Sequence, residues 1–207
     1  MEKILSLFAA AAMLAACSGG EECTVKGSVP EGVTSVNCSG VNGSATKEYP
    51  VENGKFSFTC ARSVETPVSI SLGKRTEPVL IIPDSKSIAL KITEKGASVK
   101  GSKLSEQSLA LQKWAVKLYT ATSGDMEKMF EAGDSKAAAD IMNKRDKDIV
   151  AHCRPIFNAH KNDYLGVQAL VMMINKVDSK EFVSMYESAS EAVKQDFRLS
   201  GYYNNLK

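Results

Sequence analysis

Five cysteines and two histidines are the side chains of this 207-residue chain that could support redox, nucleophilic or metal chemistry. Thiol-disulfide exchange uses two cysteines one helical turn apart, so that one thiolate is stabilised and the other resolves the mixed disulfide. No two cysteines here have the C-x-x-C spacing that this requires. The cysteines are Cys17, Cys23, Cys38, Cys60 and Cys153.

The two histidines, His152 and His160, are eight residues apart. On one continuous helix they would lie within about 80° of each other at 3.6 residues per turn. Pro155 interrupts that geometry, and Cys153 adjoins His152 and so points elsewhere. Serine hydrolases of the G-x-S-x-G type and phosphate-binding loops also have sequence signatures, and neither is present. The sequence therefore predicts no catalytic residue, no metal site and no cofactor, and we expect a protein that is not an enzyme.

Cys17 has a different role, which its surroundings indicate. Residues 4–16 form an apolar run of signal-peptide length, too short for the roughly 20 residues that span a bilayer. The run ends in Leu14-Ala15-Ala16-Cys17, which resembles the lipobox of bacterial lipoproteins. We expect residues 1–16 to be a signal peptide and Cys17 to be lipidated; the other interpretation is a buried N-terminal helix that ends in cysteine.

Residues 17–22 are expected to be a lipidated tether, because Ser18, Gly19 and Gly20 are small and flexible and two glutamates follow. Several acyl chains give durable membrane attachment, since each buried CH₂ contributes about 0.8 kcal/mol. By resemblance to lipoprotein sorting rules, serine after the lipidated cysteine favours the outer membrane over the inner. The prediction is a cell-envelope lipoprotein attached to a membrane by lipid.

The charge distribution argues against a nucleic-acid partner. The net charge is +2, and it is evenly spread: residues 18–101 carry 10 basic and 9 acidic side chains, and residues 102–207 carry 15 and 14, so each part is +1. A phosphate-binding surface needs clustered Lys and Arg, which this chain lacks.

Residues 23–101 have the period-two alternation of strands, for example in Val68, Ile70 and Leu72 and again at 88–92. Further strands are expected at 23–29, 34–38, 79–82 and 97–100. Seven or eight short strands with one apolar face each need a second sheet to cover them. We predict a small antiparallel β-sandwich over 23–101, within an α+β chain.

Asn53-Gly54 is the clearest turn signal in this region, because both residues accept the positive φ angles of a two-residue hairpin. If the first strand runs antiparallel to the strand after this turn, with Gly27 near Phe56, then Cys23 lies opposite Cys60. A structural disulfide between Cys23 and Cys60 is our hypothesis for an oxidising compartment. Buried free thiols are the alternative.

Residues 102–207 change to helical spacing and are predicted to form a small all-α region. Gly124 and Gly133 are expected to punctuate it, Asp134-Ser135 to cap a helix over 136–151, and Pro155 to end or kink that helix. Its first helix is marked by apolar residues at offsets of seven, three and four: Leu104, Leu111, Trp114 and Leu118.

Later helices are expected to begin at Asn162-Asp163 and at Asp178, whose pairing with Glu181 resembles a capping box. A last helix is predicted to carry Val193, Phe197, Tyr203 and Leu206. The aromatic residues of the region could line a groove, but their helical spacing favours packing, with Tyr202 and Tyr203 expected to be exposed. These aromatics are Trp114, Tyr119, Phe130, Phe157, Tyr202 and Tyr203.

Three short runs carry a family resemblance: VKGSV at 25–29, GKFSF at 54–58 and VKGS at 99–102. With the lipobox, their order resembles the domain of unknown function 4369, found near the N-terminus of bacterial envelope thiol-disulfide oxidoreductases. In those relatives the helices lead into a thioredoxin-like domain, which we expect this chain to lack. The resemblance implies fold and location but transfers no redox residue.

We therefore expect a non-catalytic binding or scaffold module with a protein or small-molecule partner. The alternative is the accessory half of a thiol-disulfide oxidoreductase system whose thioredoxin-like domain is on another chain. A stand-alone thiol enzyme is a third hypothesis. The expected partners are the membrane, through the lipid anchor, and a small ligand or an envelope protein such as a thioredoxin-like protein.

Overall fold

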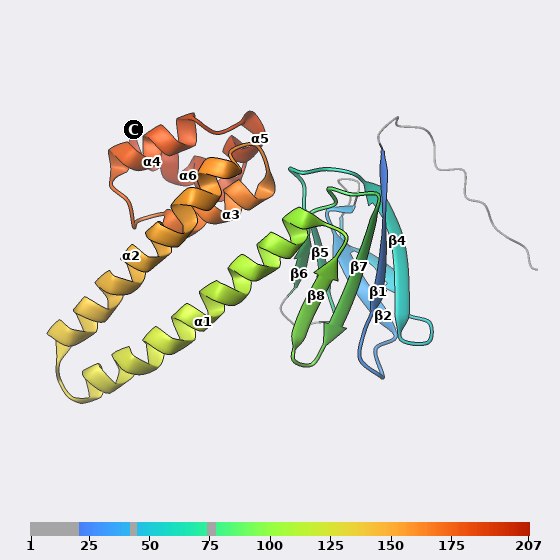
Figure 1. Cartoon of the computed structure of the whole chain (residues 1–207), viewed down its shortest axis with the longest axis horizontal. Coiled ribbons are helices and arrows are strands. Elements are labelled where there is room, and N and C mark those ends of the chain that lie inside the picture. The colour runs from blue at the N-terminus through green and yellow to red at the C-terminus, as the bar shows by residue number, and fades with distance from the viewer. Residues whose placement is uncertain (1–20, 42–44, 74–77) are drawn as a thin grey trace, which may run out of the picture.

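The computed structural model describes residues 21–41, 45–73 and 78–207, so Cys17 and the expected signal peptide lie outside the described residues. Within these ranges the fold is α+β, with eight strands followed by six helices. Figure 1 shows the strands gathered at one end of the molecule and a long pair of helices, α1 and α2, extending away from them.

The strands form two four-stranded sheets, one with the order β4-β1-β7-β8 and the other with the order β3-β2-β5-β6. Along most strands buried and exposed residues alternate, as the period-two pattern predicted. The strands of the first sheet are β1 (Glu22–Ser28), β4 (Lys55–Ala61), β7 (Ser87–Thr93) and β8 (Gly96–Lys100). Those of the second are β2 (Ser35–Ser39), β3 (Lys47–Pro50), β5 (Val68–Ser71) and β6 (Val79–Ile81).

The predicted register between β1 and β4 is confirmed: the strands are antiparallel, with Gly27 opposite Phe56 and Cys23 opposite Cys60. The expectation of a purely antiparallel arrangement is wrong, because β1 and β7 pair in parallel. Nearly sixty residues separate these strands, so no tight turn imposes an antiparallel pairing on them. A parallel pair needs a long connection, which the intervening strands provide.

The two-residue turn at Asn53-Gly54 is also confirmed. Both residues have positive φ, 52° and 71°, and Glu52 and Lys55 exchange two backbone hydrogen bonds across the turn. The strands that flank it, however, belong to different sheets, since β3 pairs with β2 while β4 pairs with β1. The turn therefore moves the chain from one sheet to the other.

One hydrophobic core contains buried side chains from both sheets, including Val25 and Ile88 of the first and Cys38 and Ile70 of the second. Across this core the ring of Tyr49 lies 5.0 Å from the ring of Phe58, centroid to centroid. The exposed fraction is 0% for Val25, Ile88, Cys38 and Ile70. The apolar faces of the strands are thus removed from water by one another.

The helices are α1 (Lys103–Glu131), α2 (Ser135–Ala159), α3 (Tyr164–Met173), α4 (Ser179–Glu187), α5 (Glu191–Lys194) and α6 (Phe197–Leu206). Three expectations about their limits are wrong. Gly124 lies inside α1, Pro155 lies inside α2 and does not end it, and the predicted last helix is divided into α5 and α6. A helical glycine costs about 1 kcal/mol, and an internal proline costs about 3 kcal/mol. Around Pro155, packing of the buried residues Cys153 and Phe157 outweighs this cost.

The predicted helix starts are confirmed by side-chain caps. Asp134, Asp163 and Asp178 are the N-cap residues of α2, α3 and α4, and each carboxylate accepts a hydrogen bond from a backbone N–H of the first turn. A cap of this kind stabilises a helix by about 1 kcal/mol.

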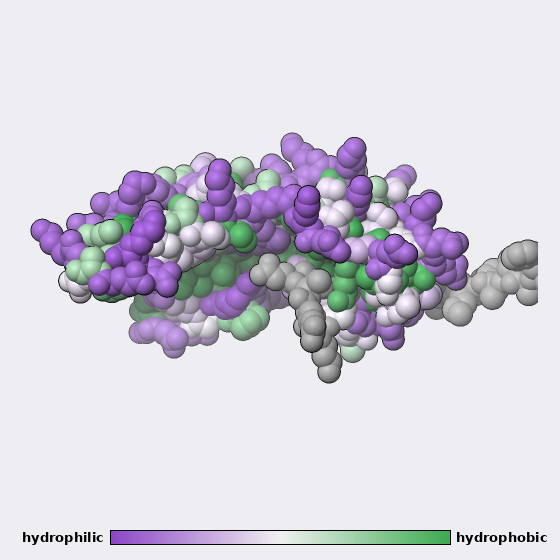
Figure 2. Space-filling model, turned by 90° about the horizontal axis from the view of Figure 1, so that it is seen from below, coloured by the Kyte–Doolittle hydropathy of each residue, from purple (hydrophilic) through white to green (hydrophobic). Residues whose placement is uncertain are grey.

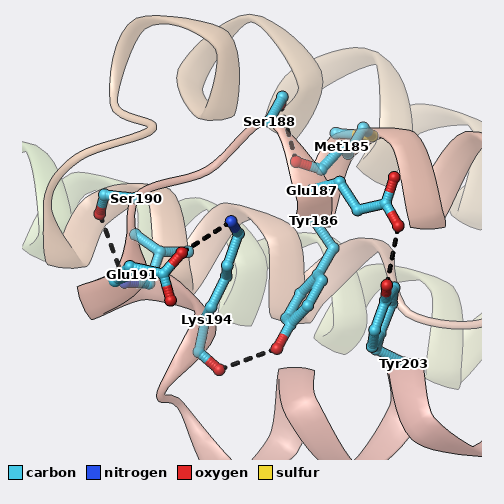
Figure 3. A network of polar contacts seen from close by, with 9 residues as sticks. Met185, Tyr186, Glu187, Ser188, Ser190, Glu191, Lys194 and Tyr203 are labelled. Atoms are coloured by element: carbon cyan, nitrogen blue, oxygen red, sulfur yellow. Dashed lines mark hydrogen bonds and ion pairs between the residues drawn. The ribbon is translucent and has the colours of Figure 1, made fainter.

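A second hydrophobic core lies among the helices, where Phe157, Phe182 and Leu199 are fully buried. Polar contacts join the last three helices around it (Figure 3): the Tyr186 hydroxyl donates to Lys194 O at 2.9 Å, and the Tyr203 hydroxyl donates to Glu187 Oε1 at 2.7 Å. Tyr203 is thus half-buried rather than exposed as expected, and so is Tyr202. Phe197 is the most exposed large apolar residue in the described chain, at 80%, because it starts a helix whose other face is packed.

Two serines at the start of α1 tie the helices to the sheets. Ser105 Oγ accepts a hydrogen bond from Ile82 N at 2.8 Å, and Ser102 Oγ donates to Ile82 O at 3.0 Å. A third contact runs from Tyr164 N, at the start of α3, to Val64 O at 2.8 Å. Among the helices described, none combines the length and apolar character that crossing a membrane requires.

Candidate functional site

A pocket of about 590 Å³ opens among α1, α2 and α3 and is the candidate site; we call it the three-helix pocket. Figure 2 shows apolar atoms gathered in a hollow of the helical part. The apolar side chains of the pocket are Ala110, Leu111, Trp114, Pro155, Ile156, Ala159 and Leu165, and its polar side chains are Gln107, His152 and His160.

The helix pattern explains how these residues meet. Gln107, Leu111 and Trp114 follow one another at helical spacing, so they form a stripe on one side of α1. His152, Ile156 and Ala159 repeat the pattern on α2. Because α1 and α2 are packed side by side, the two stripes face each other, and Leu165 of α3 closes the end.

His160 is held in one orientation by Asp163. The His160 Nδ1 atom lies 2.7 Å from Asp163 Oδ2, while Asp163 Oδ1 caps α3 by accepting from Leu165 N at 2.9 Å. A carboxylate accepts hydrogen bonds, so the proton of a neutral His160 is placed on Nδ1 and Nε2 is left as an acceptor. The pair therefore supplies an oriented imidazole at the pocket wall.

His152 packs against Trp114. The two rings are stacked, with centroids 3.8 Å apart and an interplanar angle of 14°. Trp114 is the single tryptophan of the chain. The stack joins α1 to α2 at the pocket, and it makes Trp114 a built-in fluorescent reporter of what enters.

Gln107 contributes a polar atom without a partner. Its Oε1 atom is buried, and no hydrogen bond reaches it in the described part of the protein. A buried acceptor left unpaired costs about 1–3 kcal/mol. Because this oxygen has almost no accessible surface, the Gln107 side chain would have to turn toward the pocket for a ligand N–H or O–H to pair with it.

The thiols lie elsewhere and are protected. Burial raises the pKa of all four described cysteines, to about 12 at Cys38 and Cys60 and to about 11 at Cys153. Thiolates are the reactive form, so these groups are poor nucleophiles at neutral pH. A hydrogen bond joins Cys23 and Cys60, and both are free thiols in this structure, so the disulfide between them stays a prediction.

The residues singled out from sequence are therefore only partly brought together. His152 and His160 line the same pocket, whereas Cys153 is buried beside Met172, with its sulfur 3.9 Å from the Met172 sulfur. In the described ranges, no group of three or more His, Cys, Asp or Glu is placed to hold a metal ion. The lining residues described include no hydroxyl or thiol that His160 could activate.

Sequence reasoning missed Gln107 and the role of Trp114 in the pocket. Trp114 was expected in a packed core because of its helical spacing, and it does lie beside the second core. The signal that could have located the site is that the α1 stripe with Trp114 faces the α2 stripe with His152. Whether two such stripes face each other depends on how α1 and α2 are aligned.

Comparisons of this chain with protein-family models, with curated proteins and with solved structures found no match.

Proposed function

We propose that this chain is a membrane-anchored envelope protein that binds a small ligand in the three-helix pocket without transforming it. The observation that carries the proposal is the pocket itself. Its volume of about 590 Å³ falls within the range of about 300–1,000 Å³ that is usual for small-molecule sites, which are also mainly apolar with a few placed polar groups.

The lining defines the chemistry of the ligand. An apolar or aromatic body would contact Leu111, Trp114 and Ile156. A hydrogen-bond donor on that body would pair with the His160 ring, and with Gln107 Oε1 once the Gln107 side chain turns its buried oxygen toward the pocket. Both polar atoms are acceptors when His160 is neutral. The proposed ligand is therefore an apolar ring or chain with at least one N–H or O–H group.

Binding is favoured over catalysis for two reasons. Nucleophilic catalysis requires a hydroxyl, thiol or amine within hydrogen-bond reach of the base, and the described lining of the pocket offers none to His160. The thiols are buried, with raised pKa values, and lie outside the pocket. The non-catalytic module of our sequence-based hypothesis fits these residues better than a thiol enzyme.

The proposal includes the anchor and the remaining features of the family resemblance. The sequence Leu14-Ala15-Ala16-Cys17 supports lipidation at Cys17, and Ser18 directly after it favours an outer-membrane location. The shared core of the two sheets supports a β-sandwich over 23–101. If Cys17 is the lipid attachment site, the Cys17→Ala variant should move from the detergent phase to the aqueous phase in Triton X-114 partitioning. Retention in the detergent phase would contradict the anchor.

The alternative function, an accessory half of a thiol-disulfide oxidoreductase system, predicts a different partner. A thioredoxin-like protein should then be recovered with the chain after mild crosslinking in its own cells. Reproducible absence of such a protein would reject the alternative and leave ligand binding untouched.

Ligand binding is tested with the dye 1-anilinonaphthalene-8-sulfonate, an aromatic probe with one N–H. We expect saturable quenching of Trp114 emission by energy transfer to the bound dye. Ala110→Phe, which places a ring at the pocket wall, should weaken dye binding about tenfold or more, whereas Phe197→Ala, at an exposed position of α6, should leave it unchanged.

The Gln107→Leu variant tests whether the dye uses a hydrogen bond to Gln107 or only apolar contacts. Removing an unpaired buried oxygen should leave the stability equal or higher, while dye binding that uses the Gln107 acceptor should weaken. Absence of saturable quenching in the wild type, or equal quenching in the Ala110→Phe variant, would contradict the proposed pocket function.

A further inference from the structure

The outer half of α1 carries an apolar stripe on a face other than the one that lines the three-helix pocket. Its members recur at alternating offsets of three and four residues, which is the spacing of a coiled-coil seam. Val116, Tyr119 and Phe130 are exposed by 59%, 39% and 57%. The stripe consists of four apolar residues with a polar serine at the middle position: Val116, Tyr119, Ser123, Met126 and Phe130.

Within the described chain this face is only partly covered: Arg145 of α2 lies over the Tyr119 ring and contacts the Met126 sulfur. The buried residues of α1 are Ser105, Ser108 and Leu111, all in its first three turns, so none lies between 112 and 131. The helix packs against α2, α3, β6 and β8, and Figure 1 shows the far end of the α1–α2 hairpin projecting beyond the sheets and the other helices. Of the six large apolar residues that are exposed in the described chain, Val116, Tyr119, Phe130 and also Met142 lie on this hairpin.

We propose that this stripe is the contact between two copies of the chain, whose α1 helices pair antiparallel about a two-fold axis near Ala121. Such an axis brings Val116 of one copy opposite Met126 of the other and Tyr119 opposite Ser123. With α2 of each copy alongside, the two hairpins form a four-helix bundle. A two-fold contact uses the same patch on both copies, as this one does.

Charge complementarity selects this partner and this direction. Lys113 and Glu127 flank the stripe on the same side, two heptads apart, and both are exposed. Antiparallel pairing places Lys113 of each copy beside Glu127 of the other, giving two symmetric ion pairs. Parallel pairing would place Glu127 near Thr122 and would form neither pair. Lys113 Nζ also donates to Ala97 O at 2.9 Å, which leaves two of its three donors for the second copy.

A groove at the far end of the hairpin matches the stripe in position. It has a volume of about 520 Å³ and includes Met126, Glu127 and Phe130 from α1 and Arg145 from α2. The Arg145 guanidinium lies over the Tyr119 ring, 5.0 Å from its centroid, so it fixes one wall of the groove. In the antiparallel pair this groove receives Val116 of the second copy, and the reciprocal groove receives the first.

The first test is crosslinking of the full chain in membranes. Thr120 is exposed and lies next to the proposed axis, so Thr120→Cys should give a covalent dimer with a short bis-maleimide. Ala139→Cys, an exposed position on α2 away from the stripe, is the matched control and should stay monomeric. Equal crosslinking of the two variants, or none at Thr120→Cys, would overturn the proposal.

The second test exchanges the charges. Lys113→Glu and Glu127→Lys should each weaken dimerisation about tenfold, because each replaces both ion pairs with repulsion. The double variant should restore the dimer. Residues 113 and 127 are about 21 Å apart along one helix, so restoration has to act between copies. A double variant as weak as the singles would overturn the proposal, and unchanged dye binding in the three-helix pocket would show that each variant is folded.

Discussion

Gly166 gives the sharpest prediction, because it sits where a helix start touches the chain that precedes it. Gly166 lies in the first turn of α3 and is buried. A methyl carbon built on Gly166 would lie 1.9 Å from His160 O, and real methyl carbons essentially never approach closer than 3.0 Å. Gly166→Ala therefore requires the new methyl carbon and His160 O to move apart by about 1.1 Å, the difference between these two distances.

The cost follows from which atoms have to move. The obstacle is a backbone oxygen, so no side-chain rotation relieves it, and the displacement falls on α3 or on the segment that carries His160. Overpacking of this kind lowers the free energy of unfolding by about 3 kcal/mol at the upper end of its usual range. Replacing a helical glycine with alanine raises it by about 1 kcal/mol through the higher helix propensity of alanine. The expected net loss is about 2 kcal/mol.

Two other helical glycines are matched controls. Gly124 in α1 and Gly201 in α6 have no atom within 4 Å of an added methyl carbon. Gly124→Ala and Gly201→Ala should each gain about 1 kcal/mol of stability from helix propensity alone. The same glycine-to-alanine substitution is thus expected to lower the stability at Gly166 and to raise it at the two control positions.

The measurement is urea unfolding followed by the emission of Trp114. With a slope of about 2 kcal/mol per M, Gly166→Ala should lower the midpoint by about 1 M and the two controls should raise it by about 0.5 M. Since Gly166 adjoins Leu165 and His160, dye binding in the three-helix pocket should weaken as well. A Gly166→Ala midpoint at or above that of the wild type, with the controls behaving as expected, would refute the reasoning.

Three further predictions concern buried groups. Ser105→Ala leaves the Ile82 N–H without its acceptor and should cost about 1–3 kcal/mol in urea unfolding. Burial raises the pKa of Cys153 from 9.0 to about 11, so between these pH values the folded chain keeps a proton that the unfolded chain loses. The stability should therefore be full below pH 9 and fall as the pH rises toward 11, and the fall should be smaller in the Cys153→Ala variant. Mass spectrometry with and without reductant before alkylation should detect a bridge between Cys23 and Cys60 if the envelope oxidises them, and four free thiols in the mature protein would reject that bridge.

Local turn chemistry and register could be predicted from the sequence. Asn53-Gly54 dictates its turn because positive φ at two successive residues suits few others. The close approach of Gly27 to Phe56 follows from the same register, since a methyl carbon on Gly27 would lie 2.0 Å from the Phe56 ring. These features depend on residues close in sequence or on one pairing, and short-range rules suffice for them.

Features that depend on distant partners could not be predicted in this way. The parallel pairing of β1 with β7 results from the order of strands in two sheets, which the alternation of apolar residues does not encode. Of the two effects expected of Pro155, ending α2 is wrong: the helix continues to Ala159 because Ile156 and Phe157 pack against the second core. In both places tertiary contacts outweigh the local preference.

The three-helix pocket depends on the sheets although no sheet residue lines it. Its α1 wall is tied to Ile82 by Ser105, and the start of α3 is tied to Val64 by Tyr164 N, so two of its three walls are bonded to the strand-bearing part of the chain. A ligand that binds only the assembled pocket stabilises every contact that assembly requires, by mass action. Ser105→Ala should therefore weaken dye binding, although residue 105 does not line the pocket. A saturating concentration of dye should raise the urea midpoint of that variant. If Ser105→Ala lost stability but bound the dye as the wild type does, the sheets would not hold the pocket in shape.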